Sequence, residues 1–150
     1  QLIFLPWMNG VAAAEARSWF EEGNRWMSEA EYQKAIESYQ SAVMRLPGFM
    51  EGWRAKGLAE LRKAEELSIR GMGVQSEPYY RSAVQSFMRA YPSFSDDPQV
   101  LSGIGKALYA LGNEKESIPY LKESLRIQPG DPTVSVILDQ AMRKSNSKGG

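Results

Sequence analysis

Residues 19–47 read WFEEGNRWMSEAEYQKAIESYQSAVMRLP, and a related pattern returns at residues 101–129. Six positions carry it in the first copy: Trp19, Gly23, Ala35, Tyr39, Ala42 and Pro47. The second copy has Leu101, Gly105, Ser117, Leu121, Ser124 and Pro129. The intervals are four, twelve, four, three and five residues in both copies. Such self-similarity marks a repeat array, in which each unit buries its apolar face by stacking on a neighbour.

Apolar residues in and around these copies recur every three or four positions, which predicts helices. Seven helices are expected, at about 12–27, 32–46, 50–70, 78–91 and 98–111, between the turn at 112–114 and Pro129, and at 132–144. Asp97 and Asp131 each precede a proline and are predicted N-caps of the helices that follow. Trp19, Trp26 and Trp53 fall on apolar faces, so we expect them in the core.

The pattern resembles the tetratricopeptide repeat, a helical pair of about 34 residues. The resemblance covers residues 16–129 and implies an all-α, right-handed solenoid of antiparallel helix pairs. Glycine at the mid-helix position (Gly23, Gly57 and Gly105) would let the two helices of each pair approach closely. The expected parts are an apolar lead-in (1–11), a repeat domain (12–144) with repeats at 16–49, 50–97 and 98–131 and a capping helix at 132–144, and a disordered tail (145–150).

The middle repeat departs from the pattern. Thirty residues separate Trp53 from Ala83, where sixteen separate Trp19 from Ala35. This indicates an insertion near residues 62–77, which we expect to lengthen the third helix and to add a loop.

In the tetratricopeptide family the inner helices line a concave groove that binds peptides. The resemblance therefore implies a protein-interaction scaffold or adaptor whose partner is an unidentified protein or peptide. Matching offsets place ten residues in the groove: Arg17, Phe20, Asn24, Met27, Arg54, Leu58, Leu61, Ser102, Lys106 and Tyr109. Because the set mixes apolar side chains with cations, it favours a hydrophobic segment of some acidic or carboxylate character.

Chaperone-binding members of the family carry a clamp of basic and asparagine side chains for a C-terminal carboxylate. Only Asn24 matches that clamp. Phe20, Ala55, Gln99 and Gly103 stand where the clamp has lysine, asparagine, lysine and arginine. The resemblance therefore does not extend to a heat-shock co-chaperone role.

The composition argues against other classes of function. Eighteen basic residues balance eighteen acidic ones, so no net field favours nucleic acid. Histidine and cysteine are absent, which removes the commonest general base and the commonest metal ligands. We expect no enzyme activity, catalytic residue, cofactor or metal.

Residues 2–8, LIFLPWM, form an apolar run that is too short to span a bilayer. Ala12 and Ala14 follow it, as at the end of a secretory signal peptide. If residues 1–14 are such a remnant, the protein is exported or periplasmic. If they are an ordinary lead-in, it is cytoplasmic. An alternative function uses this segment for homo-oligomeric self-assembly, as a structural or assembly factor of the cell envelope.

Overall fold

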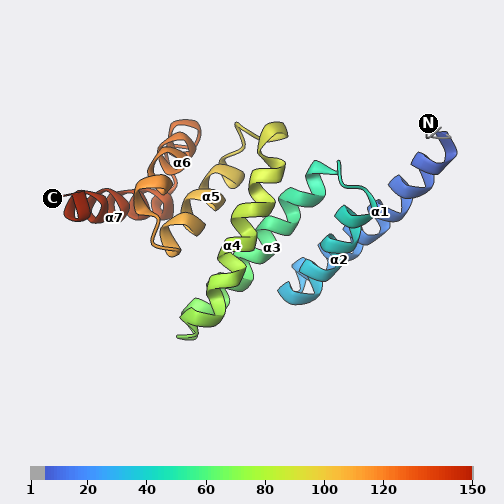
Figure 1. Cartoon of the computed structure of the whole chain (residues 1–150), viewed down its shortest axis with the longest axis horizontal. Helices are drawn as coiled ribbons and strands as arrows, with labels where there is room; N and C mark the ends of the chain where they lie inside the picture. Colours follow the sequence, from blue (N-terminus) through green and yellow to red (C-terminus); the bar gives the residue numbers. More distant parts are fainter. Residues whose placement is uncertain (1–5, 150) are drawn as a thin grey trace.

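A row of antiparallel helical hairpins forms the protein in a computed structural model, which describes residues 6–149 and the side chains of residues 10–148 (Figure 1). The helices are α1 (Pro6–Ser28), α2 (Tyr32–Arg45), α3 (Met50–Ile69), α4 (Gly73–Ala90), α5 (Pro98–Ala110), α6 (Glu114–Ile127) and α7 (Pro132–Gly149), with a 3₁₀ turn, η1, at Tyr91–Ser93. Hairpins α1–α2, α3–α4 and α5–α6 stack side by side, and α7 packs on α6. The all-α repeat solenoid is confirmed.

Each hairpin turns through one residue with positive φ: Ala30 (56°), Gly71 (77°) and Gly112 (85°). The hydrogen bonds around these residues repeat. Glu31 N donates to Trp26 O, Met72 N to Leu67 O and Asn113 N to Leu108 O, each at 2.9 Å. This is the Schellman arrangement that satisfies the last carbonyls of a helix. The three hairpins therefore close in the same way.

Within the hairpins, the mid-helix glycines allow the helices to approach closely, as predicted. A Cβ atom on Gly23 would lie 2.5 Å from the ring of Tyr39, and one on Gly105 would lie 2.6 Å from Leu121. The equivalent contact in the middle hairpin joins Gly57 to Phe87. Buried clusters then join one hairpin to the next, because Ala59 of α3 packs with α2, and α5 packs with α3 and α4.

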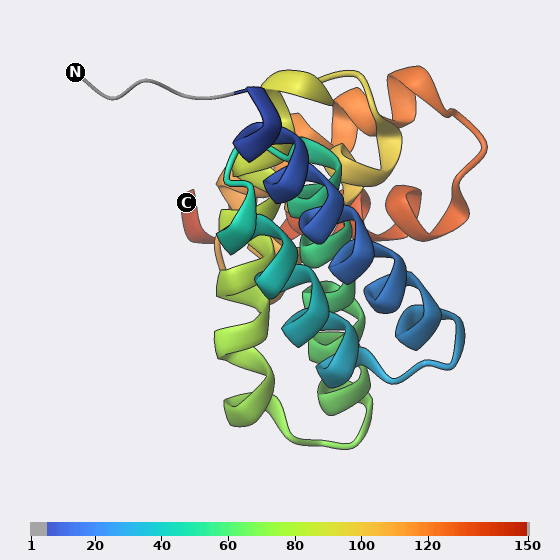
Figure 2. The same ribbon diagram turned by 90° about the vertical axis from the view of Figure 1, so that its right-hand side faces the viewer.

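The middle hairpin differs from the sequence-based prediction. The insertion lengthens both of its helices, so that α3 has 20 residues and α4 has 18, against 13 in α5 and 14 in α6. Helix α4 begins at Gly73, so the prediction that Pro78 opens it is wrong. Pro78 is tolerated inside the helix because its missing N–H leaves only the carbonyl of the exposed Val74 to water. The hairpin projects beyond its neighbours (Figure 2).

The ends of the chain are more helical than predicted. Helix α1 begins at Pro6 rather than near Ala12. Helix α7 runs to Gly149, so the prediction of a disordered tail is wrong for residues 145–149. At this end of the helix, Lys148 Nζ lies 2.8 Å from a carboxylate oxygen of Glu114, and its hydrogen bond lowers the pKa of that group.

The predictions about the N-terminal segment fall largely outside the described residues. Residues 1–5 are not among them, and neither are the side chains of residues 6–9. A leader remnant and self-assembly through residues 2–8 therefore stay predictions. Among the described helices, none combines the length and the apolar character that a membrane span needs.

The tryptophans show how neighbouring hairpins control burial. Trp53 is half-buried, and its Nε1 donates to Pro47 O at 2.9 Å in the loop after α2. Trp26 packs on the core of the first hairpin. Trp19 is 42% exposed, so the prediction that it belongs to the core is wrong. Trp53 is covered by the loop that precedes its own hairpin. Among the described residues, no such loop precedes α1 to cover Trp19 in the same way.

Candidate peptide-binding site

A cavity of about 470 Å³ lies between α1, α3 and the start of α5. These are the first helices of the three hairpins, and the turn after α4 closes one side. Apolar and polar side chains both line the cavity: Phe20, Asn24, Met27, Tyr39, Glu51, Arg54, Ala55, Leu58, Phe94, Asp97 and Gln99. The mixture of apolar surface with a few hydrogen-bonding groups is typical of ligand sites.

The apolar wall of the cavity is held by aromatic packing. The ring of Phe20 lies 5.7 Å from that of Tyr39 and 5.1 Å from that of Phe49, edge-on to the latter. Offset and edge-on arrangements are favourable because of the ring quadrupoles. Met27 packs beside Phe20 on α1, and its flexible thioether suits a surface that adapts to a ligand.

Asn24 has its orientation set by Tyr39. The Tyr39 hydroxyl donates to Asn24 Oδ1 at 2.6 Å. Burial raises the pKa of Tyr39 to about 12, so the hydroxyl keeps its proton and remains a donor at neutral pH. With its oxygen occupied, Asn24 presents its amide NH₂ to other partners.

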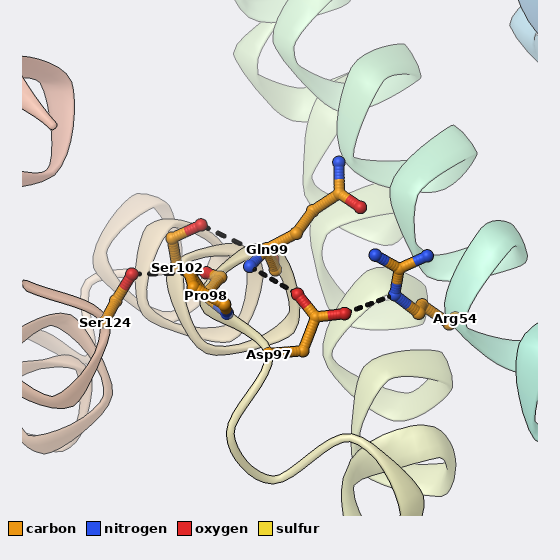
Figure 3. A network of polar contacts seen from close by, with 6 residues as sticks. All are labelled: Arg54, Asp97, Pro98, Gln99, Ser102 and Ser124. Atoms are coloured by element: carbon orange, nitrogen blue, oxygen red, sulfur yellow. Dashed lines mark hydrogen bonds and ion pairs between the residues drawn. The ribbon is translucent and has the colours of Figure 1, made fainter. Parts of the chain in front are cut away.

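Arg54 is held by residues at the start of α5 (Figure 3). Its Nε donates to Asp97 Oδ2 at 2.7 Å, and its guanidinium lies 5.3 Å from the ring centroid of Phe94. Asp97 Oδ1 accepts from Gln99 N at 2.8 Å, which confirms the predicted N-cap. The terminal nitrogens of Arg54 and the amide of Gln99 point away from the Asp97 carboxylate. The pair therefore joins two hairpins and leaves several donors directed outward.

The sequence-predicted groove residues separate into three groups. Phe20, Asn24, Met27, Arg54 and Leu58 line the cavity together. Two others, Lys106 and Tyr109, line a second cavity of about 380 Å³ near the tip of the middle hairpin.

The remaining three lie elsewhere. Arg17 lies over the ring of Phe49, with its Cζ 5.7 Å from the centroid, outside the cavity lining. Leu61 is only 2% exposed because it packs in the core between α3, α4 and α5. Ser102 is also buried, and its hydroxyl donates to Gln99 O. The prediction that Leu61 and Ser102 present side chains to a ligand is therefore wrong.

Several residues that line the cavity do not follow from the repeat offsets. Asp97 was recognised as a cap, but its contact with Arg54 spans 43 residues and depends on how two hairpins stack. Phe94 follows the irregular turn η1, where no periodicity indicates a face. Glu51 could have been found, since it lies one turn before Arg54 on the same helix.

The described residues hold no cluster of three or more carboxylate, histidine or cysteine side chains that could bind a metal ion. The contacts at the site are hydrogen bonds, one ion pair and apolar surface. They are suited to holding a peptide backbone and its side chains.

Solved structures of known proteins share this architecture. The TPR domain of OM64 from Arabidopsis has a TM-score of 0.71 and 16% identity, over 88% of this chain and 98% of that one. The first TPR of Spaghetti (RPAP3), bound to the HSP90 peptide SRMEEVD, also has a TM-score of 0.71 and 16% identity, over 89% of this chain and 95% of that one. This chain has the tetratricopeptide repeat fold. The second TPR domain of human RPAP3, in complex with the HSP70 peptide SGPTIEEVD, has a TM-score of 0.66 and 17% identity, over 89% of this chain and 97% of that one. No protein-family model and no curated protein sequence matches the chain.

Proposed function

We propose that the protein is a non-enzymatic interaction scaffold that binds an extended peptide segment of another protein in the cavity between α1, α3 and α5. The observation that carries this proposal is the lining itself. Phe20, Met27 and Leu58 offer apolar contact, and the NH₂ group of Asn24 and the outer nitrogens of Arg54 offer donors. Extended peptides are recognised in this way, because backbone carbonyls accept from fixed donors and side chains fill apolar pockets. The structural neighbours with bound HSP90 and HSP70 peptides support a peptide-binding role for this fold.

Selection from a random peptide library would test the proposal. Peptides enriched on the wild-type protein would be synthesised, and their affinities measured by fluorescence polarisation. Ala55→Leu adds a larger side chain inside the cavity. We expect it to weaken binding at least about tenfold, since it occupies the space of a ligand side chain.

Ala13→Leu is the matched control, because Ala13 is exposed on α1 and does not line the cavity. It should leave the affinity unchanged. Circular dichroism would establish that both variants fold. Equal affinity of the selected peptides for wild type and Ala55→Leu would overturn the proposed site.

A further inference from the structure

The charges around the cavity are not those of a site for an acidic ligand. Among the described residues, its lining contains one cation, Arg54, and two carboxylates, Glu51 and Asp97, so the formal charge of this lining is negative. Asp97 lies against Arg54 and neutralises it, and its side chain is largely buried. A carboxylate that approached the outer nitrogens of Arg54 would meet a guanidinium whose charge Asp97 already balances.

Glu51 is the lining carboxylate that does not pair with Arg54. It is exposed in the first turn of α3, at the rim of the cavity, and among the described residues it has no ion-pair partner within 4.0 Å. The other cations predicted for the groove are not among the described lining residues of this cavity, and neither is ion-paired with Glu51. Arg17 lies over Phe49, and Lys106 lines the second cavity beside Glu65. Charge complementarity therefore favours a positively charged ligand group next to Glu51.

The donors in the lining, the Asn24 amide and the Asp97-paired guanidinium of Arg54, favour a peptide backbone over a terminal carboxylate. Tyr39 fixes Asn24 so that its NH₂ group is presented, and Asp97 leaves the outer nitrogens of Arg54 available. Backbone carbonyls along an extended segment can accept from such donors without a charge of their own. Phe20, Met27, Leu58 and Phe94 provide apolar surface for a side chain of the same segment.

We propose that the cavity selects an internal peptide segment in which an apolar side chain lies beside a lysine or arginine. The apolar side chain fills the cavity, the backbone accepts from Asn24 and Arg54, and the cation pairs with Glu51. This inference rests on the proposed function, and it reverses the acidic preference expected from the sequence. In this arrangement Tyr39 acts as a positioning residue for Asn24.

The test uses peptides displayed on phage through their C-termini, so that no free terminal carboxylate is present. Peptides whose binding is lost in Ala55→Leu should be enriched in lysine or arginine next to an apolar residue. Acetylated, amidated copies would then be made with that basic residue replaced by glutamine or glutamate. On the wild type we expect affinity to fall about threefold for glutamine and about tenfold for glutamate, which are effects typical of a rim ion pair.

Glu51→Gln should abolish the difference between the lysine and glutamine peptides. Glu37→Gln is the matched control, because Glu37 is an exposed carboxylate on α2 outside the cavity lining. It should leave the difference intact. Raising the salt concentration should shrink the lysine preference on the wild type.

Three results overturn the inference and can be told apart. If Ala55-dependent peptides are acidic, or if glutamate copies bind as tightly as lysine copies, the site binds peptides but not the class proposed here. If a lysine preference persists in Glu51→Gln, the assignment of Glu51 fails. If no selected peptide depends on Ala55, the proposed function fails and the inference fails with it.

Discussion

The first hairpin, α1–α2, and the middle hairpin, α3–α4, carry the same repeat pattern in different surroundings. Trp53 follows Trp19 by 34 residues, yet Trp53 is held against the preceding loop and Trp19 is 42% exposed. Glu60 occupies the position that Trp26 has in the first hairpin, and it is buried. The repeat position fixes the direction in which a side chain points. The neighbouring hairpin decides what the side chain meets.

The two aromatic residues that face the mid-helix glycines show the same contrast. Tyr39 contacts Gly23, and its hydroxyl reaches the edge of the cavity. Phe87 is 0% exposed and lies between two glycines, Gly57 of its own hairpin and Gly103 of the next. A Cβ atom on Gly103 would lie only 2.5 Å from the Phe87 ring. Phe87 therefore joins two hairpins, whereas Tyr39 joins its hairpin to the lining of the cavity.

The largest expected effect is at this aromatic position. Phe87→Ala should lower the free energy of unfolding by about 3–5 kcal/mol, because it leaves a cavity between two hairpins that cannot close it. Tyr39→Phe keeps the ring and should cost only about 1 kcal/mol for the lost hydrogen bond. Urea unfolding followed by circular dichroism measures both. Equal losses would mean that Phe87 is no more constrained than Tyr39.

The tryptophans provide the next test. Trp53→Ala should cost about 2 kcal/mol, because Trp53 donates to Pro47 O and lies under the guanidinium of Arg89, 4.6 Å from its ring centroid. Trp19→Ala should cost less than about 0.5 kcal/mol, as is usual for a surface side chain. Urea midpoints of the two variants give the comparison. A similar loss at Trp19 would show that another surface covers it in solution.

The sequence was sufficient to predict the helices and how they pair into hairpins. Repeat spacing, mid-helix glycines and Asp-Pro caps are local signals, and the structure has a helix wherever they predicted one. The insertion was also visible in the spacing between Trp53 and Ala83. Its division between α3 and α4 could not be predicted, because Gly73 is a poor helix former and Pro78 is typical of a first helical residue, and both indicated a later start of α4.

The site was less predictable, for a physical reason. Matching offsets selected Phe20, Asn24 and Arg54, and these three residues line one cavity because their positions lie on the inner faces of α1 and α3. That the cavity binds a peptide stays a prediction. Offsets carry no information about contacts between hairpins. The Arg54–Asp97 pair balances the charge of the one cation among the described lining residues, and it depends on the path of the chain between α4 and α5.

The hairpin turns offer a test with a smaller expected effect, in which a substitution in the first hairpin should increase the stability of the protein. Ala30 has φ of 56°, whereas the equivalent positions hold Gly71 and Gly112. A left-handed conformation costs a residue with a Cβ atom about 1 kcal/mol or more, so Ala30→Gly should stabilise the protein by about that amount. Gly112→Ala should destabilise it by a similar amount. Thermal unfolding of both variants checks the pair, and a lower melting temperature for Ala30→Gly would contradict the assignment of strain.

The smallest expected effect concerns Glu60, the polar substitute for Trp26 in the middle hairpin. Its carboxylate accepts from Ser86 Oγ at 2.6 Å and from Lys56 Nζ at 2.9 Å. Burial nevertheless raises the pKa of Glu60 above its ordinary value of 4.5, and Lys56 and Ser86 only partly oppose this. The native state therefore binds this proton more tightly than the unfolded state does. The contribution of Glu60 to stability is largest below the unfolded pKa and declines as pH rises through the folded pKa.

Glu60→Gln removes this titration. The free energy of unfolding of the wild type, minus that of Glu60→Gln, should therefore fall as pH rises from about 4 to about 7, by less than about 1 kcal/mol. Urea unfolding at a series of pH values measures the difference. Glu37→Gln, at an exposed position of the first hairpin, should show no such decline. A difference for Glu60 that rises with pH would mean that the Lys56 ammonium outweighs burial, and that the ion pair stabilises the middle hairpin where the first hairpin uses a tryptophan.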